Sequence, residues 1–420
     1  MHIAIVGCGT GGQAASLYLH RAGHRVSLFE RSPTLAPVGA GLLLQPTGMQ
    51  VLDELGVGDR VRTLATPVDR LHGVNHAGRT VLDLRYADLS PGLVGMGVHR
   101  GGLFATLLDE MERSGIDVAR GVTVARYAVE ASGRVAIFDD RDQPLGEFDL
   151  LVAADGARSL LRTQSACVSR ASMYPFGALW FVANDPGGMY GRTLSQVYRD
   201  TRGMIGFLPS GRRATHEPPT VSVFWSIRRD QFEAVREAGI DAFKASVRAL
   251  TDRAEPVLAQ LLDADQLIGA SYMDVVMSRT SDGPVVFLGD AAHAMSPQLG
   301  QGVNLALLDA QALARSLASL LPDERPAPSR IAESLERCDR MRRANVRYYQ
   351  WGSRWLTPIF QSRWSLLGLP RDACMGPMCR VGLLRRVMLE SLVGIKTGVM
   401  PWAKDRGLMG DPPGAPVGRA

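Results

Sequence analysis

An apolar run that leads directly into closely spaced glycines is the feature that most constrains this chain. Residues 3–6 read Ile-Ala-Ile-Val, and Gly-Cys-Gly-Thr-Gly-Gly follows at 7–12. Four consecutive apolar residues are typical of a strand buried on both faces of a parallel sheet. A helix is expected from Gln13 to Ala22, and a second strand over 24–29 ends at Glu30. The pattern predicts a strand–helix–strand unit of Rossmann type in an α/β fold.

The glycines and the acidic residue of this unit each have a physical role in binding a dinucleotide. Gly7 permits a tight turn, Gly9 lets a pyrophosphate approach, and Gly12 lets the helix pack close to the strand. The N-terminus of the helix adds amide donors and the positive end of its dipole. Glu30 is placed to accept hydrogen bonds from ribose hydroxyls. The unit predicts a dinucleotide site, and Glu30 would accept NAD or the adenosine half of FAD equally well.

A second motif follows another apolar strand. Residues 150–153 run into Asp155-Gly156, and Ser159 and Arg162 come three residues apart. That spacing predicts a helix with both side chains on one face. An ordinary strand–turn–helix connection without a ligand would read the same way, because Asp-Gly is common in turns.

A third motif joins a strand over 285–288 to Gly289-Asp290, with a long helix expected from Gly302. An aspartate at a strand end suits sugar or ribityl hydroxyls, and a helix N-terminus behind a glycine-rich loop suits polar or anionic ligand atoms. His293 is a candidate general base or metal ligand. No second ligand pair stands near it in the sequence, so a structural role is favoured and no metal site is expected.

These three blocks, in this order and spacing, resemble the fingerprints of the single-component, class A FAD monooxygenases of the para-hydroxybenzoate hydroxylase type. The third block reads Gly-Asp-Ala-Ala-His-x-x-x-Pro-x-x-Gly-Gln-Gly-x-Asn over 289–304. The resemblance extends to Gly-Leu-Leu-Leu-Gln-Pro-Thr at 41–47 and to His-Arg-Gly-x-Leu at 99–103. It spans residues 1 to about 320.

The resemblance implies where FAD contacts this chain. The pyrophosphate would lie against the glycines of 7–12, the adenosine against Glu30, Arg31 and the backbone of Val124. Gln45 and Arg100 would lie near the ribityl-phosphate part, Asp290 would hold the ribityl chain, and 297–304 would line the flavin ring. The full set is Gly7, Gly9, Gly11, Gly12, Glu30, Arg31, Gln45, Arg100, Val124, Asp290, Pro297, Gly300, Gln301, Gly302, Val303 and Asn304.

Two segments lack Rossmann character and predict a separate mixed β-sheet inserted into the FAD-binding domain. The expected FAD-binding domain comprises 1–70, 99–171 and 278–350, the sheet domain comprises 71–98 and 172–277, and 351–420 form a helical region with a flexible tail from Asp411. By resemblance the sheet covers the flavin and forms the substrate pocket. Candidate wall residues are Trp180, Phe181, Tyr198, Met204, Phe207 and Trp225, although they would serve equally as the core of the sheet.

Composition and charge exclude several other functions. The net charge of +5 comes from Lys and Arg spread along 420 residues, without the basic stripe of a nucleic-acid-binding protein. The five cysteines have no metal or disulfide spacing, and no apolar run approaches the ~18 residues that span a bilayer. We expect a soluble, cytoplasmic monomer or homodimer. An amphipathic, basic-edged helix over 381–395 suits a membrane surface or a partner, although packing on the flavin domain is favoured.

The resemblance implies a reaction as well as a cofactor. NADPH or NADH would bind transiently, because only one dinucleotide fold is present, and would reduce FAD. O₂ would then give a C4a-hydroperoxyflavin that hydroxylates an aromatic or other electron-rich small molecule. A halogenase or a reductase of the same fold are alternatives, the halogenase weakened because Trp225 is followed by Ser-Ile-Arg and not by its family motif. A non-catalytic FAD sensor and an NAD-dependent dehydrogenase remain as rivals.

Overall fold

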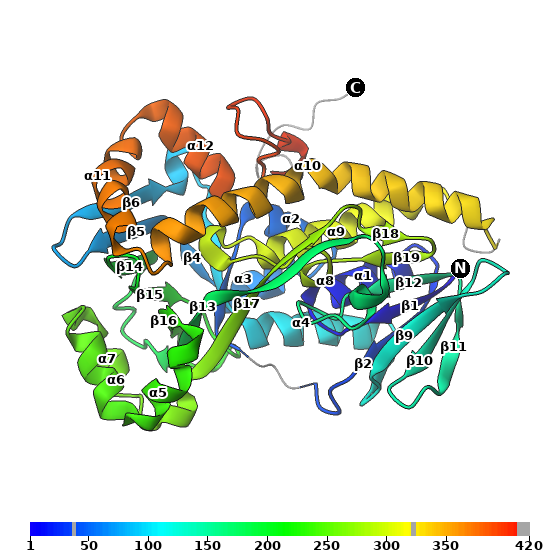
Figure 1. Cartoon of the computed structure of the whole chain (residues 1–420), viewed down its shortest axis with the longest axis horizontal. Coiled ribbons are helices and arrows are strands. Elements are labelled where there is room, and N and C mark those ends of the chain that lie inside the picture. Colours follow the sequence, from blue (N-terminus) through cyan, green and yellow to red (C-terminus); the bar gives the residue numbers. More distant parts are fainter. Residues whose placement is uncertain (36–38, 321–324, 410–420) are drawn as a thin grey trace.

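A computed structural model describes residues 1–35, 39–320 and 325–409, so the tail expected from Asp411 lies outside the described residues. Its first layer is a six-stranded sheet in the order β18-β19-β12-β1-β2-β8, parallel except for β18 (Figure 1). The strands are β1 His2–Val6, β2 Arg25–Glu30, β8 Val118–Arg120, β12 Leu150–Ala153, β18 Ser281–Asp282 and β19 Val285–Phe287. The strand–helix–strand unit predicted from the first thirty residues is the centre of this sheet.

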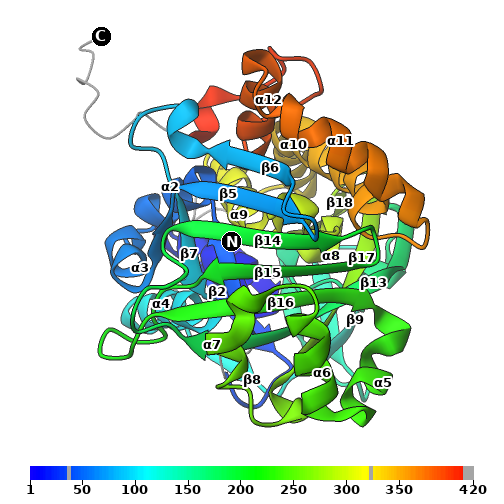
Figure 2. The same cartoon turned by 90° about the vertical axis from the view of Figure 1, so that its left-hand side faces the viewer.

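A seven-stranded mixed sheet forms the second layer, in the order β17-β13-β16-β15-β14-β5-β6. Its strands are β5 Arg70–Asn75, β6 Thr80–Arg85, β13 Val168–Asn184, β14 Thr193–Arg199, β15 Gly203–Pro209, β16 Thr220–Arg228 and β17 Ile268–Met277. The two segments that lack Rossmann character therefore share one sheet, because β14 pairs with β5 in parallel. Figure 2 shows this sheet with helices α5 (Phe232–Glu237), α6 (Gly239–Arg248) and α7 (Glu255–Leu258) in front of it.

Two three-stranded sheets complete the β structure. The first, β11-β10-β9, flanks the adenosine side of the predicted site, and the second, β3-β7-β4, joins the two large sheets. Their bounds are β3 Gly41–Leu44, β4 Thr66–Val68, β7 Gly95–His99, β9 Val124–Val129, β10 Val135–Asp139 and β11 Pro144–Phe148. The other helices are α1 Thr10–Arg21, α2 Pro46–Glu54, α3 Gly58–Leu64, α4 Arg100–Arg113, α8 Asp290–His293, α9 Gly302–Leu317, α10 Pro328–Phe360, α11 Gly368–Met378 and α12 Gly382–Leu392.

Helix α10 runs along both large sheets (Figure 1). Near its middle, Arg342 donates to Asp309 of α9. About three turns further on, Arg354 pairs with Asp274 of β17, and Gln361 just past the helix donates to Ser226 of β16. The expected boundary at residue 350 thus falls inside one continuous helix that holds the two layers together.

The chain after Asp155-Gly156 is not the α-helix that the spacing of Ser159 and Arg162 predicted. Only a 3₁₀ segment, Leu161–Gln164, forms there. The Asp155 carboxylate instead accepts the backbone N–H of Leu160, at 3.0 Å, which closes a turn in place of a first helical turn. The prediction was wrong because local side-chain hydrogen bonding competes with helix formation at Asp and Ser.

The C-terminal half of helix α12 packs mainly on the inserted sheet domain, beside β6, and only partly on the FAD-binding domain where we expected it. Leu389, Leu392 and Val393 are buried in one cluster with Leu43 and Tyr86. Its N-terminal half is different, because Leu383 and Leu384 are exposed. Among the residues that the structure describes, no helix combines the length and the apolar character that crossing a bilayer requires.

Candidate functional site

Three glycines in the turn between β1 and α1 differ in the space that a side chain would have. One has free space, and at the other two a Cβ would collide with the backbone. Gly7 has a φ of +103°, and a Cβ there would lie 2.4 Å from the carbonyl oxygen of Ala154. A Cβ on Gly12 would lie 1.9 Å from the carbonyl oxygen of Gly7. A Cβ on Gly9 would meet nothing within 4 Å. The first two glycines are required by packing, whereas the third faces free space at the N-terminus of α1, where a pyrophosphate is expected.

Glu30 lies at the end of β2 beside this turn. Its carboxylate accepts the backbone N–H of Cys8 at 2.8 Å and that of Ser32 at 2.9 Å, so its position is fixed. The backbone N–H of Val122 donates to the Glu30 carbonyl, which brings the start of β9 at Val124 alongside. Arg31 is exposed next to them. The adenosine end of the predicted set is therefore brought together.

Arg162 ties the second motif to the third. This buried side chain donates to the carbonyl oxygen of Ala291 at 2.9 Å and to that of Ala157 at 2.7 Å. Burial lowers the pKa of Arg162, and the negative charges of Asp155 and Asp290 act in the opposite direction. The second motif acts here as a brace behind the loop that carries Asp290.

A buried ionic network holds the same loop from the other side. Nε2 of His293 lies 2.6 Å from the Asp309 carboxylate, which also accepts the backbone N–H of Gly289 at 3.0 Å. Nε of Arg342 donates to the second oxygen of Asp309 at 2.8 Å. Burial alone would raise the pKa of Asp309, but His293 and Arg342 hold it well below its usual range. The geometry agrees with a structural role for His293.

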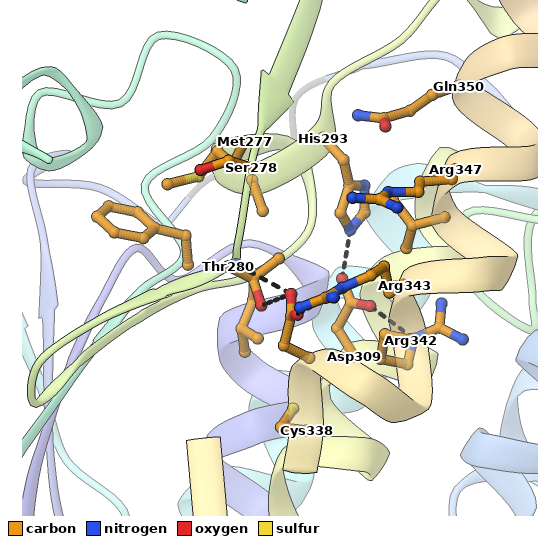
Figure 3. Close-up of a pocket in the computed structure, with 15 residues that line it drawn as sticks. Met277, Ser278, Thr280, His293, Asp309, Cys338, Arg342, Arg343, Arg347 and Gln350 are labelled. Carbon is orange, nitrogen blue, oxygen red and sulfur yellow. Dashed lines mark hydrogen bonds and ion pairs between the residues drawn. The ribbon is translucent and has the colours of Figure 1, made fainter. Parts of the chain in front are cut away.

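A small cavity of about 30 Å³ lies beside this network. Figure 3 shows the hydrogen-bonded His293 and Asp309 in the lining of this cavity, together with Arg343, Arg347 and Gln350 of α10. None of the residues predicted to hold FAD lines this cavity. It has about the size that one water molecule needs and belongs to the support of the loop, not to the cofactor cleft.

The flavin end of the predicted set is assembled around the N-terminus of α9. Oδ1 of Asn304 accepts the backbone N–H of Gln45 at 2.8 Å, and the Asn304 amide donates to the Leu43 carbonyl at 3.3 Å. Oε1 of Gln45 accepts the Tyr86 hydroxyl at 2.8 Å. The Gln301 amide donates to the Leu392 carbonyl at 2.6 Å. Strand β3 and α9 are thus locked together where the ring is expected.

The remaining predicted residues lie around this junction. Asp290 is exposed, and a Cβ on Gly302 would lie 3.9 Å from its Oδ1, so the carboxylate adjoins the N-terminus of α9. Gly300 has a φ of +61°, and a Cβ there would meet nothing within 4 Å. Pro297 is exposed in the segment before it. Arg100 is exposed at the first residue of α4 and lies against Gly39.

The residues present fit FAD. Gly9 and Gly300 leave open space at the two ends of the predicted site. Between them, Nε2 of Gln45 and Oε1 of Gln301 are buried and have no hydrogen-bond partner among the described residues. Buried polar atoms without a partner are rare in folded proteins, and a ligand with donors and acceptors accounts for them. The network residues Tyr86, Asp309 and Arg342 were not identified from the sequence, because only contacts across the fold mark them.

Part of the predicted substrate wall is wrong. Phe207 and Phe181 lie in the core between the seven-stranded sheet and helices α5–α7, and Trp225 packs edge-on against Phe243 of α6 at 5.9 Å between ring centroids. Because successive side chains alternate between the faces of a strand, their neighbours point the other way. Tyr198 and Met204 are on that other face, but they are buried against Phe360 of α10.

Trp180 is the one residue of the predicted wall that is on the inner face and only half-buried. Its ring centroid lies 4.8 Å from that of Phe224, and its Nε1 donates to the Tyr272 hydroxyl at 3.4 Å. The same face carries Ser222, which accepts the backbone N–H of Gly41 in β3. This face is therefore the one turned toward the FAD-binding domain.

Comparisons with known proteins agree with this geometry. A family model described as an FAD binding domain matches residues 1–347. The FAD-dependent urate hydroxylase of Klebsiella pneumoniae is 27% identical over 354 residues, which cover 81% of this chain and 87% of that protein. A putative 2-heptyl-3-hydroxy-4(1H)-quinolone synthase of Rhodococcus erythropolis is 28% identical over 416 residues, covering 95% and 97%.

The fold is also that of a solved structure. The crystal structure of Klebsiella pneumoniae HpxO complexed with FAD and uric acid superimposes with a TM-score of 0.73 at 20% identity, covering 93% of this chain and 97% of that one. The α/β architecture with an inserted sheet is thereby confirmed. The chain belongs to the FAD-binding-domain family and is an FAD-dependent monooxygenase of class A.

Proposed function

We propose that this enzyme hydroxylates a lipophilic, nitrogen-containing aromatic ring that bears an exocyclic oxygen. Urate and 4(1H)-quinolone, the compounds named for two of its relatives, share a nitrogen-containing ring with an exocyclic oxygen, and the 2-heptyl chain makes the second compound lipophilic. The quinolone synthase aligns over 95% of this chain, including the C-terminal region, whereas the urate hydroxylase aligns over 81%. A quinolone-like substrate is therefore favoured over a purine.

The inner face of the seven-stranded sheet is the observation that carries the proposal. Trp180 and Phe224 present adjoining rings there, which suits a flat aromatic substrate. The Tyr272 hydroxyl already accepts a hydrogen bond from Trp180, so its own proton is free to be donated. Burial raises the pKa of Tyr272 to about 12, which keeps this hydroxyl neutral. A neutral donor beside a stacked ring would orient an exocyclic oxygen without demanding an anionic substrate.

The residues of the chain itself would bind FAD and the substrate, orient them toward each other and exclude water. Gly9 and Glu30 would hold the pyrophosphate and ribose of FAD, Asp290 its ribityl chain, and the start of α9 the polar edge of its ring. When bound, FAD supplies the redox chemistry with NADPH or NADH as reductant and O₂ as the oxygen source. The network of Asp309, His293 and Arg342 fixes the loop that carries Asp290.

We propose that the protein acts in the cytoplasm as a monomer or a homodimer. Its five cysteines are free thiols. Burial raises the pKa of Cys8 and that of Cys338 to about 12 each, so both remain protonated and unreactive at neutral pH. Such thiols suit a reducing compartment that also supplies the nicotinamide cofactor.

The decisive test is a screen for NADPH and NADH oxidation stimulated by 4-quinolones, hydroxypyridines and phenols, with mass spectrometry of the products. We expect a 4-quinolone to stimulate oxidation and to gain one oxygen atom. Asp290→Ala should lose FAD, seen as loss of the flavin absorbance, and therefore all turnover. If the protein binds FAD but no tested compound stimulates NAD(P)H oxidation or gains oxygen, a flavin-carrying sensor would be favoured instead.

The Tyr272→Phe variant tests the orienting role separately. It should keep its FAD and raise KM or uncouple NAD(P)H oxidation from oxygen transfer, because the ring would no longer be held by its oxygen. Equal KM and coupling in this variant and the wild type would remove Tyr272 from the substrate site.

A further inference from the structure

Exposed apolar side chains are concentrated in the C-terminal part of the chain. Of the 18 large apolar side chains that are exposed in the described structure, 12 lie within 351–402. Six of them come from the residue before α12, from the first turn of α12 and from the loop after it, and we call these six residues the C-terminal rim. They are Val381, Leu383, Leu384, Val399, Met400 and Trp402.

The two parts of the C-terminal rim lie on one edge of the molecule. In Figures 1 and 2 the turn between α11 and α12 and the red loop after α12 both stand at the top. Helix α12 connects them, with its buried Leu389 and Leu392 turned toward the body of the protein. Leu383 is 58% exposed and Trp402 is 76% exposed, so the rim projects its apolar side chains outward. A soluble monomer rarely leaves so many large apolar groups together at one edge.

The same region carries the positive charge of the chain. Residues 351–405 contain eight Lys or Arg and three Asp or Glu, a net charge of +5, which equals the formal net charge of the whole protein. Much of this charge is not free at the surface. Arg371 and Lys396 are buried, and ion pairs with Asp274, Asp88 or Glu390 are formed by Arg354, Arg385, Arg386 and Lys404. Arg380, between α11 and α12, is exposed beside the rim and is itself in no ion pair with another described residue.

Two occupants fit such an apolar edge, a second copy of the chain and a lipid surface, and the positive charge beside it distinguishes them. A second copy of the chain would meet the rim through a two-fold axis, which would bring the unpaired Arg380 side chains of the two copies toward each other. An anionic lipid surface satisfies both properties, because basic side chains are attracted to its headgroups while Trp and Leu enter the interfacial layer. We propose that the C-terminal rim docks the enzyme on an anionic phospholipid bilayer.

Vesicle sedimentation tests the proposal with the FAD-loaded full chain. The probes are vesicles of phosphatidylcholine alone and of phosphatidylcholine with phosphatidylglycerol in equal parts. We expect the wild type to sediment with the anionic vesicles, to remain in the supernatant with the neutral ones, and to be released by high salt. The double variant Leu383→Ser, Trp402→Ser should lower the partition coefficient at least tenfold, and Arg380→Glu should lower it less.

A matched control uses two equally exposed apolar residues of the sheet domain. The double variant Leu262→Ser, Met189→Ser should sediment like the wild type, because Leu262 (77% exposed) and Met189 (59%) lie outside the rim. Flavin absorbance and melting temperature of both double variants should match the wild type, since none of the four side chains is buried.

Three results would overturn the proposal. The first is a wild type that does not sediment with anionic vesicles, and the second is a wild type that binds neutral vesicles equally well. The third is a rim variant that binds like its control. If the rim variant instead changes the sedimentation coefficient of the free protein in analytical ultracentrifugation, a second copy of the chain is the occupant. None of these readouts depends on the substrate, so they stand apart from the test of the proposed function.

Discussion

The turn of residues 7–12 together with Glu30, which we call the cofactor edge, and the inserted sheet use their residues in opposite ways. At the cofactor edge, Gly7, Gly9 and Gly12 matter for what their backbone permits, and each is marked by its spacing in the sequence. In the seven-stranded sheet, Trp180 and Phe181 are neighbours of similar type that face opposite sides. A site formed by backbone groups can be recognised from a local sequence pattern. A site formed by side chains cannot, because it depends on which face of each strand is covered by helices.

The largest effect should come from the glycine pair of the cofactor edge. Gly12→Ala places a Cβ 1.9 Å from the carbonyl oxygen of Gly7, so the unfolding free energy should fall by more than about 4 kcal/mol and FAD should be lost. Gly9→Ala meets nothing within 4 Å in a backbone region that alanine adopts. It should keep the melting temperature of the FAD-free protein and lose FAD affinity. Equal melting temperatures for the two variants would contradict this division.

A second pair compares the two faces of the inserted sheet. Phe207→Ala removes a fully buried ring from the core under α5–α7 and should destabilise the protein by about 3 to 4 kcal/mol, measured by urea unfolding. Trp180→Ala removes a half-buried ring and should raise KM at least tenfold with a much smaller change in unfolding. The reverse outcome would mean that the outer face, and not the inner one, contacts the substrate.

A third prediction concerns the side chain that contributes most at the cofactor edge. Glu30→Gln should weaken FAD binding by roughly 30- to 100-fold, about 2 to 3 kcal/mol, because hydrogen bonds to a charged carboxylate are stronger than those to an amide. Fluorescence titration of the FAD-free protein measures this. Glu54→Gln, a surface carboxylate outside the predicted site, is the control and should bind FAD normally.

The smallest effect is a pH dependence at the start of β2. Burial lowers the pKa of His24 from 6.5 to about 4, and its Nδ1 has no partner among the described residues. Since the pKa of His24 is lower in the folded state, the contribution of the neutral imidazole to the free energy of unfolding is complete above pH 6.5. It is lost as the pH falls toward 4. We expect a loss of about 1 to 2 kcal/mol between pH 7 and pH 5. His24→Gln should flatten this slope, and His216→Gln, an exposed histidine, should leave it unchanged.

The sequence predicted the cofactor edge far better than the inserted sheet, for physical reasons. The glycine turn, Glu30 and the start of α9 follow from local periodicity and turn chemistry. The face of each sheet residue does not, because the β13–β17 register shifts between Met173 and Gly177 and strand periodicity cannot say which face a helix covers. Tyr86, Asp309 and Arg342 act through contacts distant in sequence, so no local pattern marks them.

Helix α10 has a consequence for the order in which the protein is made. Asp274 and Asp309 are both buried, and each receives an arginine from α10, which leaves the ribosome after them. Until about residue 360 has emerged, Asp274 has only Arg170 and Asp309 has only His293 as an ion-pair partner among the described residues, and burying a carboxylate with part of its partners missing is unfavourable. We expect the nascent chain to keep its two layers apart until α10 arrives. The junction of the two layers, beside which we propose that substrate binds, is therefore among the last parts of the molecule to form during synthesis.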